Sequence, residues 1–243
     1  MPTQLSDGKK LFIDIETIPG QQPDLMDRVA EGINPPGNIS KKETIEKWEA
    51  TVKPGLIEKA WRATALNPTL GEIIVIGFAI DNNEPEMFYR ESILQPETEL
   101  LIRFHDRLKE RLRDKYSPQV IRRPLWIGTN ITGFDLRYIW IRSVINRVCP
   151  LVYIPYNHKP WADHVYDIMY EWGGLQHNIT SSQDAIAKAL GLPGKTGMDG
   201  SKVWDMVKEG KIEKVVDYCK DDIIQARKIY HRMNFSLQFV DSK

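Results

Sequence analysis

The stretch that decides the fold is Phe12-Ile13-Asp14-Ile15-Glu16-Thr17, in which apolar and acidic side chains alternate. In a strand alternate side chains share a face, so Asp14 and Glu16 project together while Ile13 and Ile15 form an apolar face. Two carboxylates held side by side repel each other unless a cation lies between them. Hard oxygen ligands on a rigid strand suit Mg²⁺ or Mn²⁺. A strand end that turns toward solvent would show the same short pattern.

The apolar pattern around this strand predicts an α/β fold. Further strands are expected at residues 73–80, 86–89 and 125–127, with the first two forming a hairpin. Apolar residues at helical spacing predict a helix that follows Pro96, one over residues 134–148 and one over residues 212–233. Two further helices are expected, one from a Ser181 or Ser182 cap to Leu190 and one that starts at Gly200. This order of strands and helices favours a mixed sheet with helices on its faces. Residues 20–70 are expected to be a helical insertion, with Ser40 capping one helix, folded against the domain.

A second acidic signal is Asn130-Ile131-Thr132-Gly133-Phe134-Asp135, which directly follows the expected strand at 125–127. A carboxylate in the first turn of a helix that follows a parallel strand faces the carboxyl edge of the sheet, where open α/β sheets place their sites. The alternative is that Asp135 only stabilises the helix macrodipole.

The third signal is Tyr218-Cys219-Lys220-Asp221-Asp222 in the long C-terminal helix. Tyr218 and Asp222 are four residues apart and therefore share a face. Asp222 also falls in the otherwise inward stripe of Val215, Cys219 and Ala226. A carboxylate in a buried stripe needs a partner or a metal, whereas Asp221 is expected to be solvated.

Composition and charge narrow the function classes. The 243 residues are 42% hydrophobic and 27% charged, which excludes a disordered or disulfide-framework chain. The longest apolar run, Ile73–Ile80, is too short to cross a membrane, and the polar N-terminus makes the cytoplasm the default location. Cys149 and Cys219 are expected to be packed, reduced thiols. Lys plus Arg equals Asp plus Glu at 33 each, but Leu101–Arg147 holds eleven basic and four acidic residues. That stretch is a solvated face or, alternatively, a phosphate track.

Together the three motifs resemble the DEDD superfamily of 3′-5′ exonucleases, with a DxE strand, an NxxxFD segment and a YxxxD helix in that order. The chain is most similar to the stand-alone phage and bacterial exonucleases related to the proofreading domain of family-B DNA polymerases. Residues 64–68, 164–169 and 192–203 also fit that subgroup. The resemblance implies a ribonuclease H-like fold with a mixed five-stranded sheet, as a single exonuclease domain over residues 1–243.

The resemblance also implies hydrolysis at the 3′ end of single-stranded DNA by two divalent ions, with release of nucleoside monophosphates. Asp14 is expected to bridge both ions, and Asp135 to hold the second. The implied metal ligands are Asp14, Glu16, Asp135 and Asp222. Tyr218 is the implied water-positioning hydroxyl. The sister subclass has histidine one residue before this tyrosine, but residue 217 is Asp, which argues against a histidine base.

Substrate contacts and partners follow only from motif neighbourhood. The expected substrate-binding residues are Thr17, Asn67, Asn130, Phe134 and Lys202. Asn130 is expected either to support Asp135 or to touch the strand. The expected partners are single-stranded DNA 3′ ends, with RNA as an alternative substrate and a replication or repair protein as a further partner, and no membrane. A catalytically silent nucleic-acid-binding module of the same fold is the other alternative.

Overall fold

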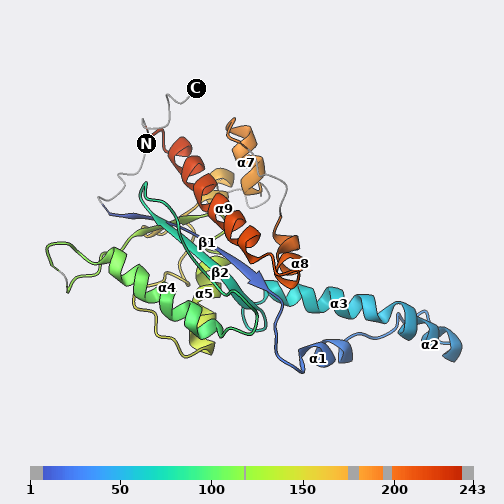
Figure 1. Cartoon of the computed structure of the whole chain (residues 1–243). Helices are drawn as coiled ribbons and strands as arrows, with labels where there is room; N and C mark the ends of the chain where they lie inside the picture. The colour runs from blue at the N-terminus through green and yellow to red at the C-terminus, as the bar shows by residue number, and fades with distance from the viewer. Residues whose placement is uncertain (1–7, 118, 175–180, 194–198, 237–243) are drawn as a thin grey trace. The chain divides into compact units, whose positions relative to one another are not determined.

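The structure is a computed structural model that describes residues 8–117, 119–174, 181–193 and 199–236 (Figure 1). The chain divides into two compact units. One unit combines Met1–Glu16 with Ile73–Lys243, and the other is Thr17–Glu72.

A five-stranded mixed sheet forms the centre of the first unit, as the family resemblance implied. The strands are β1 (Lys10–Ile18), β2 (Glu72–Ile80), β3 (Glu86–Tyr89), β4 (Leu125–Gly128) and β5 (Val165–Asp167). Their order is β3-β2-β1-β4-β5, with β4 parallel to both β1 and β5 and with β2 and β3 antiparallel. Because β1, β4 and β5 run the same way, their carboxyl ends lie at one edge of the sheet. The sequence patterns predicted every strand except the three-residue β5.

Helices cover both faces of this sheet (Figure 1). They are α4 (Glu97–Leu112), α5 (Asp135–Ile145), α6 (Ile168–Gly173), α7 (Gln183–Ala189), α8 (Val203–Lys208) and α9 (Ile212–Met233), with a 3₁₀ turn, η2, at Gly200–Lys202. The apolar stripe of α4 packs on one face, where the Phe104 ring lies 6.0 Å from that of Phe78. The 22-residue α9 packs on the other, where the Tyr230 ring lies 5.6 Å from that of Phe12. The sheet is therefore buried on both faces, which explains the near-continuous apolar sequence of β2.

Helix α9 packs closely on the sheet at a glycine in β2. A Cβ atom added at Gly77 would lie 2.5 Å from the Ile223 Cδ1 atom of α9 and 2.6 Å from the Met87 Cε atom. A larger residue at position 77 would therefore require these side chains to shift.

The helix ends agree with the sequence signals in part. The Ser182 hydroxyl accepts a hydrogen bond from the Ala185 N–H and caps α7, and Gly191 has φ +68°, which suits glycine. The prediction that Ser40 caps a helix was wrong, because the residue before α2 is Lys41 and it makes no side-chain cap. The predicted start at Gly200 is a 3₁₀ turn.

The unit Thr17–Glu72 is helical, as predicted for the segment between the first two strands. Its helices are α1 (Leu25–Glu31), α2 (Lys42–Thr51), α3 (Lys53–Ala63) and the 3₁₀ turn η1 (Thr64–Leu66). The Trp61 Nε1 donates a hydrogen bond of 3.0 Å to the Gly20 carbonyl, and the Thr64 hydroxyl accepts one of 3.0 Å from the Gly20 N–H. These bonds fix α3 to the start of the unit. Its predicted packing against the rest of the chain stays a prediction.

No helix within the described part of the chain is long and apolar enough to cross a membrane.

Candidate active site

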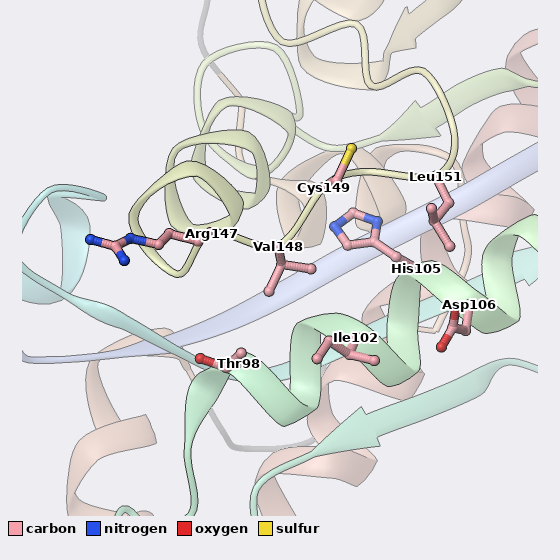
Figure 2. Close-up of a pocket in the computed structure, with 8 residues that line it drawn as sticks. All are labelled: Thr98, Ile102, His105, Asp106, Arg147, Val148, Cys149 and Leu151. Carbon is pink, nitrogen blue, oxygen red and sulfur yellow. The ribbon is translucent and has the colours of Figure 1, made fainter.

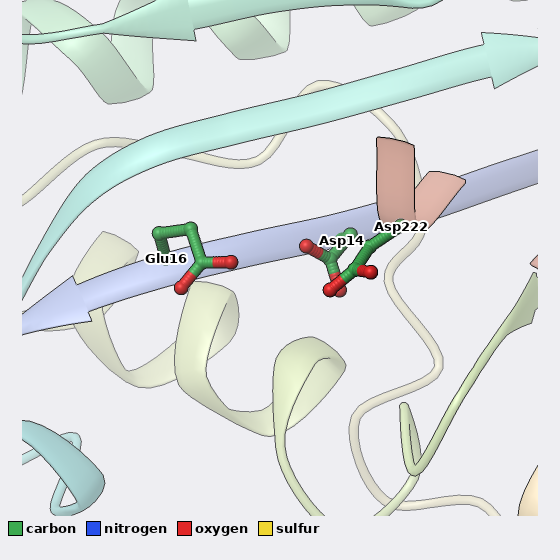
Figure 3. Close-up of side chains that lie close together, drawn as sticks. All are labelled: Asp14, Glu16 and Asp222. Atoms are coloured by element: carbon green, nitrogen blue, oxygen red, sulfur yellow. The ribbon is translucent and has the colours of Figure 1, made fainter. Parts of the chain in front are cut away.

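Strand β1 presents two acids on the face that α9 covers. Phe12 contacts Tyr230 of α9, so Asp14 and Glu16, two and four residues further along the strand, project toward the same side. Asp222 approaches them from α9 (Figure 3). One carboxylate oxygen of each acid can be chosen so that all three lie within 4.8 Å of one another. The structure therefore brings together these three predicted residues from sequence positions far apart.

The α9 backbone is held beside the strand by apolar and polar contacts. The predicted stripe of Val215, Cys219, Asp222 and Ala226 is buried, while Asp221 is exposed, as expected. The Cys219 thiol donates a hydrogen bond to the Asp14 carbonyl oxygen at 3.5 Å. Asp222 is thus fixed in position by the same stripe that packs the helix on the sheet.

Gln183, at the first position of α7, is a residue that the sequence reasoning missed. Its Nε2 donates a hydrogen bond of 2.8 Å to the Asp222 carbonyl oxygen, and its Oε1 accepts one of 2.7 Å from the Thr129 hydroxyl. The buried amide therefore ties α9 to the loop that follows β4. A buried glutamine with both ends engaged has no signal in a single sequence, because its partners are known only from the fold.

Asp135 lies at the first position of α5 and is 3% exposed. Its Oδ1 accepts a hydrogen bond of 3.1 Å from the Ile15 N–H, between the two β1 acids. A Cβ atom at Gly128 would lie 2.8 Å from the Ile13 carbonyl oxygen, so only glycine lets β4 approach this closely. Asp135 is therefore next to the three-acid cluster, although its oxygens are not part of it.

Asp167 shapes the loop that carries Asp135. Its carboxylate accepts hydrogen bonds from the Asn130 N–H at 3.0 Å, the Thr132 N–H at 3.1 Å and the Thr132 hydroxyl at 2.6 Å. It also caps α6 through the Met169 N–H. Asn130 has φ +60°, a conformation that asparagine tolerates. Asp167 thus orders the backbone of this loop and the start of α6.

Burial and mutual repulsion perturb the titration of these acids. Burial is the largest cause that raises the pKa of Asp14 well above its usual value, and the charges of Glu16, Asp135 and Asp222 add to it. Burial also raises the pKa of Asp135 to about 7, with further contributions from Asp167 and Asp222. Asp14 Oδ2 is buried and accepts no hydrogen bond from any described residue. An orphaned carboxylate oxygen among other carboxylates fits a hard divalent cation.

Tyr218 lies one turn before Asp222 on α9 and is partly exposed. Burial is the largest cause that raises its pKa, followed by the charges of Asp222, Glu16 and Asp14, and its hydroxyl hydrogen-bonds to the Asp222 carboxylate. The phenol therefore keeps its proton at neutral pH. It can orient a neighbouring group by hydrogen bonding, but it cannot act as a base there.

The expected substrate-binding residues divide between the two units. Asn130 and Lys202 are exposed, and Phe134 is partly exposed, with its ring 5.1 Å from that of Tyr138. Thr17 and Asn67 belong to the helical unit, where the Thr17 hydroxyl donates to the Ala65 carbonyl and Asn67 Oδ1 accepts from the Thr69 N–H. Of these five residues, Phe134 directly precedes Asp135 in the sequence.

Several basic side chains within residues 101–147 form ion pairs. Arg142 is buried and pairs with Glu97 at 2.6 Å. Arg107 and Arg111 both pair with Glu86, and Arg122 with Asp114. Carboxylates therefore neutralise four of the eleven basic side chains of this stretch. The stretch is in part an ion-paired face, and its use as a phosphate track stays a prediction.

A separate hollow of about 290 Å³ lies between α4 and the segment that follows α5 (Figure 2). His105 and Cys149 are among its lining residues. Cys149 is exposed, so the prediction of a packed thiol was wrong for this cysteine and correct for Cys219. The hollow lies past the end of α5, about 16 Å of helix from Asp135. It is therefore distinct from the acidic cluster.

Comparisons with known proteins agree with this geometry. Residues 66–242 match the family described as "Predicted 3'-5' exonuclease related to the exonuclease domain of PolB". No curated protein matches significantly.

Among solved structures, the family B DNA polymerase from the hyperthermophilic archaeon Pyrobaculum calidifontis is similar over 90% of this chain, with 15% identity and a TM-score of 0.53. The chain spans 23% of that polymerase chain. At this identity the likeness concerns the fold, which is the ribonuclease H-like exonuclease fold. The sequence match covers most of the chain, and the chain accordingly belongs to the predicted 3′-5′ exonucleases related to the exonuclease domain of PolB.

Proposed function

We propose that this protein is a metal-dependent exonuclease that hydrolyses single-stranded DNA from its 3′ end and releases nucleoside monophosphates. The observation that carries the proposal is the cluster of Asp14, Glu16 and Asp222, whose carboxylate oxygens lie within 4.8 Å of one another. Within it, Asp14 Oδ2 is buried without a hydrogen bond from any described residue. Such an arrangement is unfavourable until a cation neutralises it.

The four acids are the proposed ligands of two Mg²⁺ or Mn²⁺ ions. Asp14, Glu16 and Asp222 would hold one ion, and Asp135 would contribute to the other with Asp14. Two ions in such a site activate water and stabilise the attacking and leaving oxygens of the phosphodiester. All four carboxylates and Tyr218 are present, which speaks against a catalytically silent module.

Other side chains have proposed roles of their own. Tyr218, protonated at neutral pH, would orient the attacking water by hydrogen bonding rather than by removing its proton. Phe134 would stack on the terminal base beside Asp135. Asn130, Lys202, Thr17 and Asn67 are the further proposed substrate contacts.

Relation to the exonuclease domain of a DNA polymerase family supports DNA as the substrate. The sugar is tested directly by offering 5′-labelled single-stranded DNA and RNA of the same sequence. A ladder that shortens from the 3′ end of DNA in Mg²⁺ or Mn²⁺, and stops in chelator, is expected. A ladder seen with RNA alone would mean that the substrate is RNA, while the reaction would still be 3′-5′ exonucleolytic hydrolysis.

The matched variants are Asp222→Asn and Asp221→Asn. Both remove one charge from neighbouring positions of α9, but Asp222 is buried in the cluster and Asp221 is exposed. We expect Asp222→Asn to lower the rate by several orders of magnitude and Asp221→Asn to leave it unchanged. Equal activity of the two variants, or degradation of circular single-stranded DNA, would contradict the proposal.

A further inference from the structure

We propose that a surface beside the outer strand β5 binds the single-stranded nucleic acid that leads to the 3′ end. We call it the aromatic surface and define it as Arg123, Tyr153, His158, Lys159, Trp161 and Tyr170. The inference rests on the proposed function for its substrate class, but it concerns a binding site remote from the acids.

The aromatic surface consists of two pairs of rings, each with a cation over one ring. The Lys159 Nζ lies 5.3 Å from the centroid of the Trp161 ring, which in turn lies 5.3 Å from the Tyr170 ring. The Arg123 guanidinium lies 5.4 Å from the centroid of Tyr153, whose ring is 5.7 Å from that of His158. Three of these rings, Tyr153, His158 and Trp161, come from the segment between α5 and α6, and the surface thus holds two ring pairs, one tilted and one edge-on, each with a cation.

The largest rings of the surface remain accessible. Trp161 is 55% exposed and Tyr153 is 47% exposed. A tryptophan whose role was only to pack the loop would bury most of its ring. Exposed rings flanked by cations have the chemistry that single strands require, because bases stack on the rings and phosphates pair with the cations.

The aromatic surface is connected to the acidic cluster through the sheet. Strand β5 pairs in parallel with β4, and Gly128 faces Asp167 in that register. Asp167 binds the backbone of the loop that carries Asp135, and Tyr170 lies in the first turn of α6, which begins directly after Asp167. One end of the surface therefore lies at the edge of the sheet that carries the acids.

The other end of the surface precedes β5. His158, Lys159 and Trp161 come before the strand, and β5 is three residues long, or about 10 Å. A single-stranded nucleic acid whose 3′ end reaches the acids can therefore pass Tyr170 and Trp161 along the outer side of the sheet. No other strand pairs with that side of β5 in the described sheet.

The charges favour stacking over electrostatic attraction as the main source of affinity. The exposed acids Asp163 and Glu171, four residues after Lys159 and one after Tyr170 in the sequence, limit the net positive charge of this segment. The surface therefore offers two cations to the phosphates of a single-stranded nucleic acid. Removal of both should change the slope of the logarithm of the binding constant against the logarithm of the salt concentration by only about 1.4. Duplex DNA would present few unstacked bases to the rings, so the surface selects single strands.

The test measures binding without hydrolysis, so that it does not depend on activity. Fluorescence anisotropy measures the binding of 5′-labelled oligothymidylates of increasing length to the full chain that carries Asp222→Asn. If the wild-type chain has no nuclease activity, the wild-type chain is used instead. Trp161→Ala should raise the Kd for long strands about 5- to 150-fold. The shortest strands, which reach only the acids, should bind unchanged, and Trp161→Phe should retain most of the affinity.

Tyr116→Ala is the matched control, because Tyr116 is 85% exposed and the Lys115 Nζ lies 5.8 Å from its ring centroid, yet it lies outside the aromatic surface. Its affinity should equal that of the parent. If Trp161→Ala fails to fold, the double variant Lys159→Gln, Arg123→Gln tests the proposal through the salt dependence of its binding constant. Unchanged Kd and slope in these variants would overturn the proposal and would leave a protein partner as the occupant. Equal weakening at every strand length would also overturn it.

Discussion

Replacing Asp135 with asparagine should stabilise the metal-free protein at alkaline pH. Asp135 is 3% exposed, and burial raises its pKa to about 7, whereas an exposed aspartate titrates near 3.8. The folded state therefore holds the proton of this carboxyl more tightly than the unfolded state. By linkage, the free energy of unfolding falls as the pH rises from about 4 to about 7 and is then constant.

The magnitude follows from the difference of about three pKa units. At 1.36 kcal/mol per unit, ionised Asp135 costs the folded protein about 4 kcal/mol above pH 7. Asparagine removes the charge, and its side-chain oxygen can still accept the hydrogen bond from the Ile15 N–H. For a chain of this size, 4 kcal/mol corresponds to roughly 8 to 16 °C in Tm.

The assay is thermal unfolding in chelator at pH 5 and pH 8, for wild type, Asp135→Asn and the exposed control Asp221→Asn. The Asp135→Asn advantage should be large at pH 8 and much smaller at pH 5. Added Mg²⁺ or Mn²⁺ should raise the Tm of wild type more than that of Asp135→Asn. A variant less stable than wild type at pH 8 in chelator would refute the reasoning, because it would mean that the carboxylate stabilises the fold without metal.

Three further predictions concern the groups around the acids and the hollow at the far end of α5. Tyr218→Phe should lower kcat by about 10- to 10³-fold in single-turnover assays while metal affinity is retained, and a loss as complete as that of Asp222→Asn would assign the hydroxyl a larger role. Gln183→Leu should cost about 1 to 3 kcal/mol in denaturant unfolding, because it leaves the Asp222 carbonyl and the Thr129 hydroxyl without this partner. Unchanged stability would show that water replaces the amide. Burial lowers the pKa of His105 to about 4, so the folded state loses about 3 kcal/mol as the pH falls from 6.5 to 4. His105→Gln should abolish that part of the acid sensitivity, and an identical pH profile would disprove it.

The sheet and the three acidic motifs could be predicted because local patterns determine them. Asp14 and Glu16 alternate with isoleucines, and Asp222 interrupts a stripe of α9 that is otherwise apolar. In both elements the side chain's direction follows from the backbone period alone. The strands other than β5 and the faces that carry these acids were therefore predictable without knowledge of long-range contacts, whereas the five-stranded fold was implied by the family resemblance.

The features that could not be predicted depend on contacts between distant segments. Strand β5 is three residues long, too short for a periodic pattern. The buried pair of Arg142 and Glu97 joins two helices, and neither residue differs in sequence from an exposed charge. Ser40 has the composition of a helix cap, but α2 begins two residues later, because capping preference is weak beside tertiary packing.

The acidic cluster is a local conflict that the rest of the fold tolerates. Asp222 is flanked on α9 by buried Cys219, Ile223 and Ala226, and Ile223 packs against the sheet at Gly77. These apolar contacts hold the helix in place although its acid approaches Asp14 and Glu16, which it repels. A fold selected for stability alone would place an apolar residue at position 222, as the stripe does elsewhere. Among the described residues, the buried carboxylate of Asp222 lies where it meets two others, and this placement supports the metal-dependent reaction proposed above.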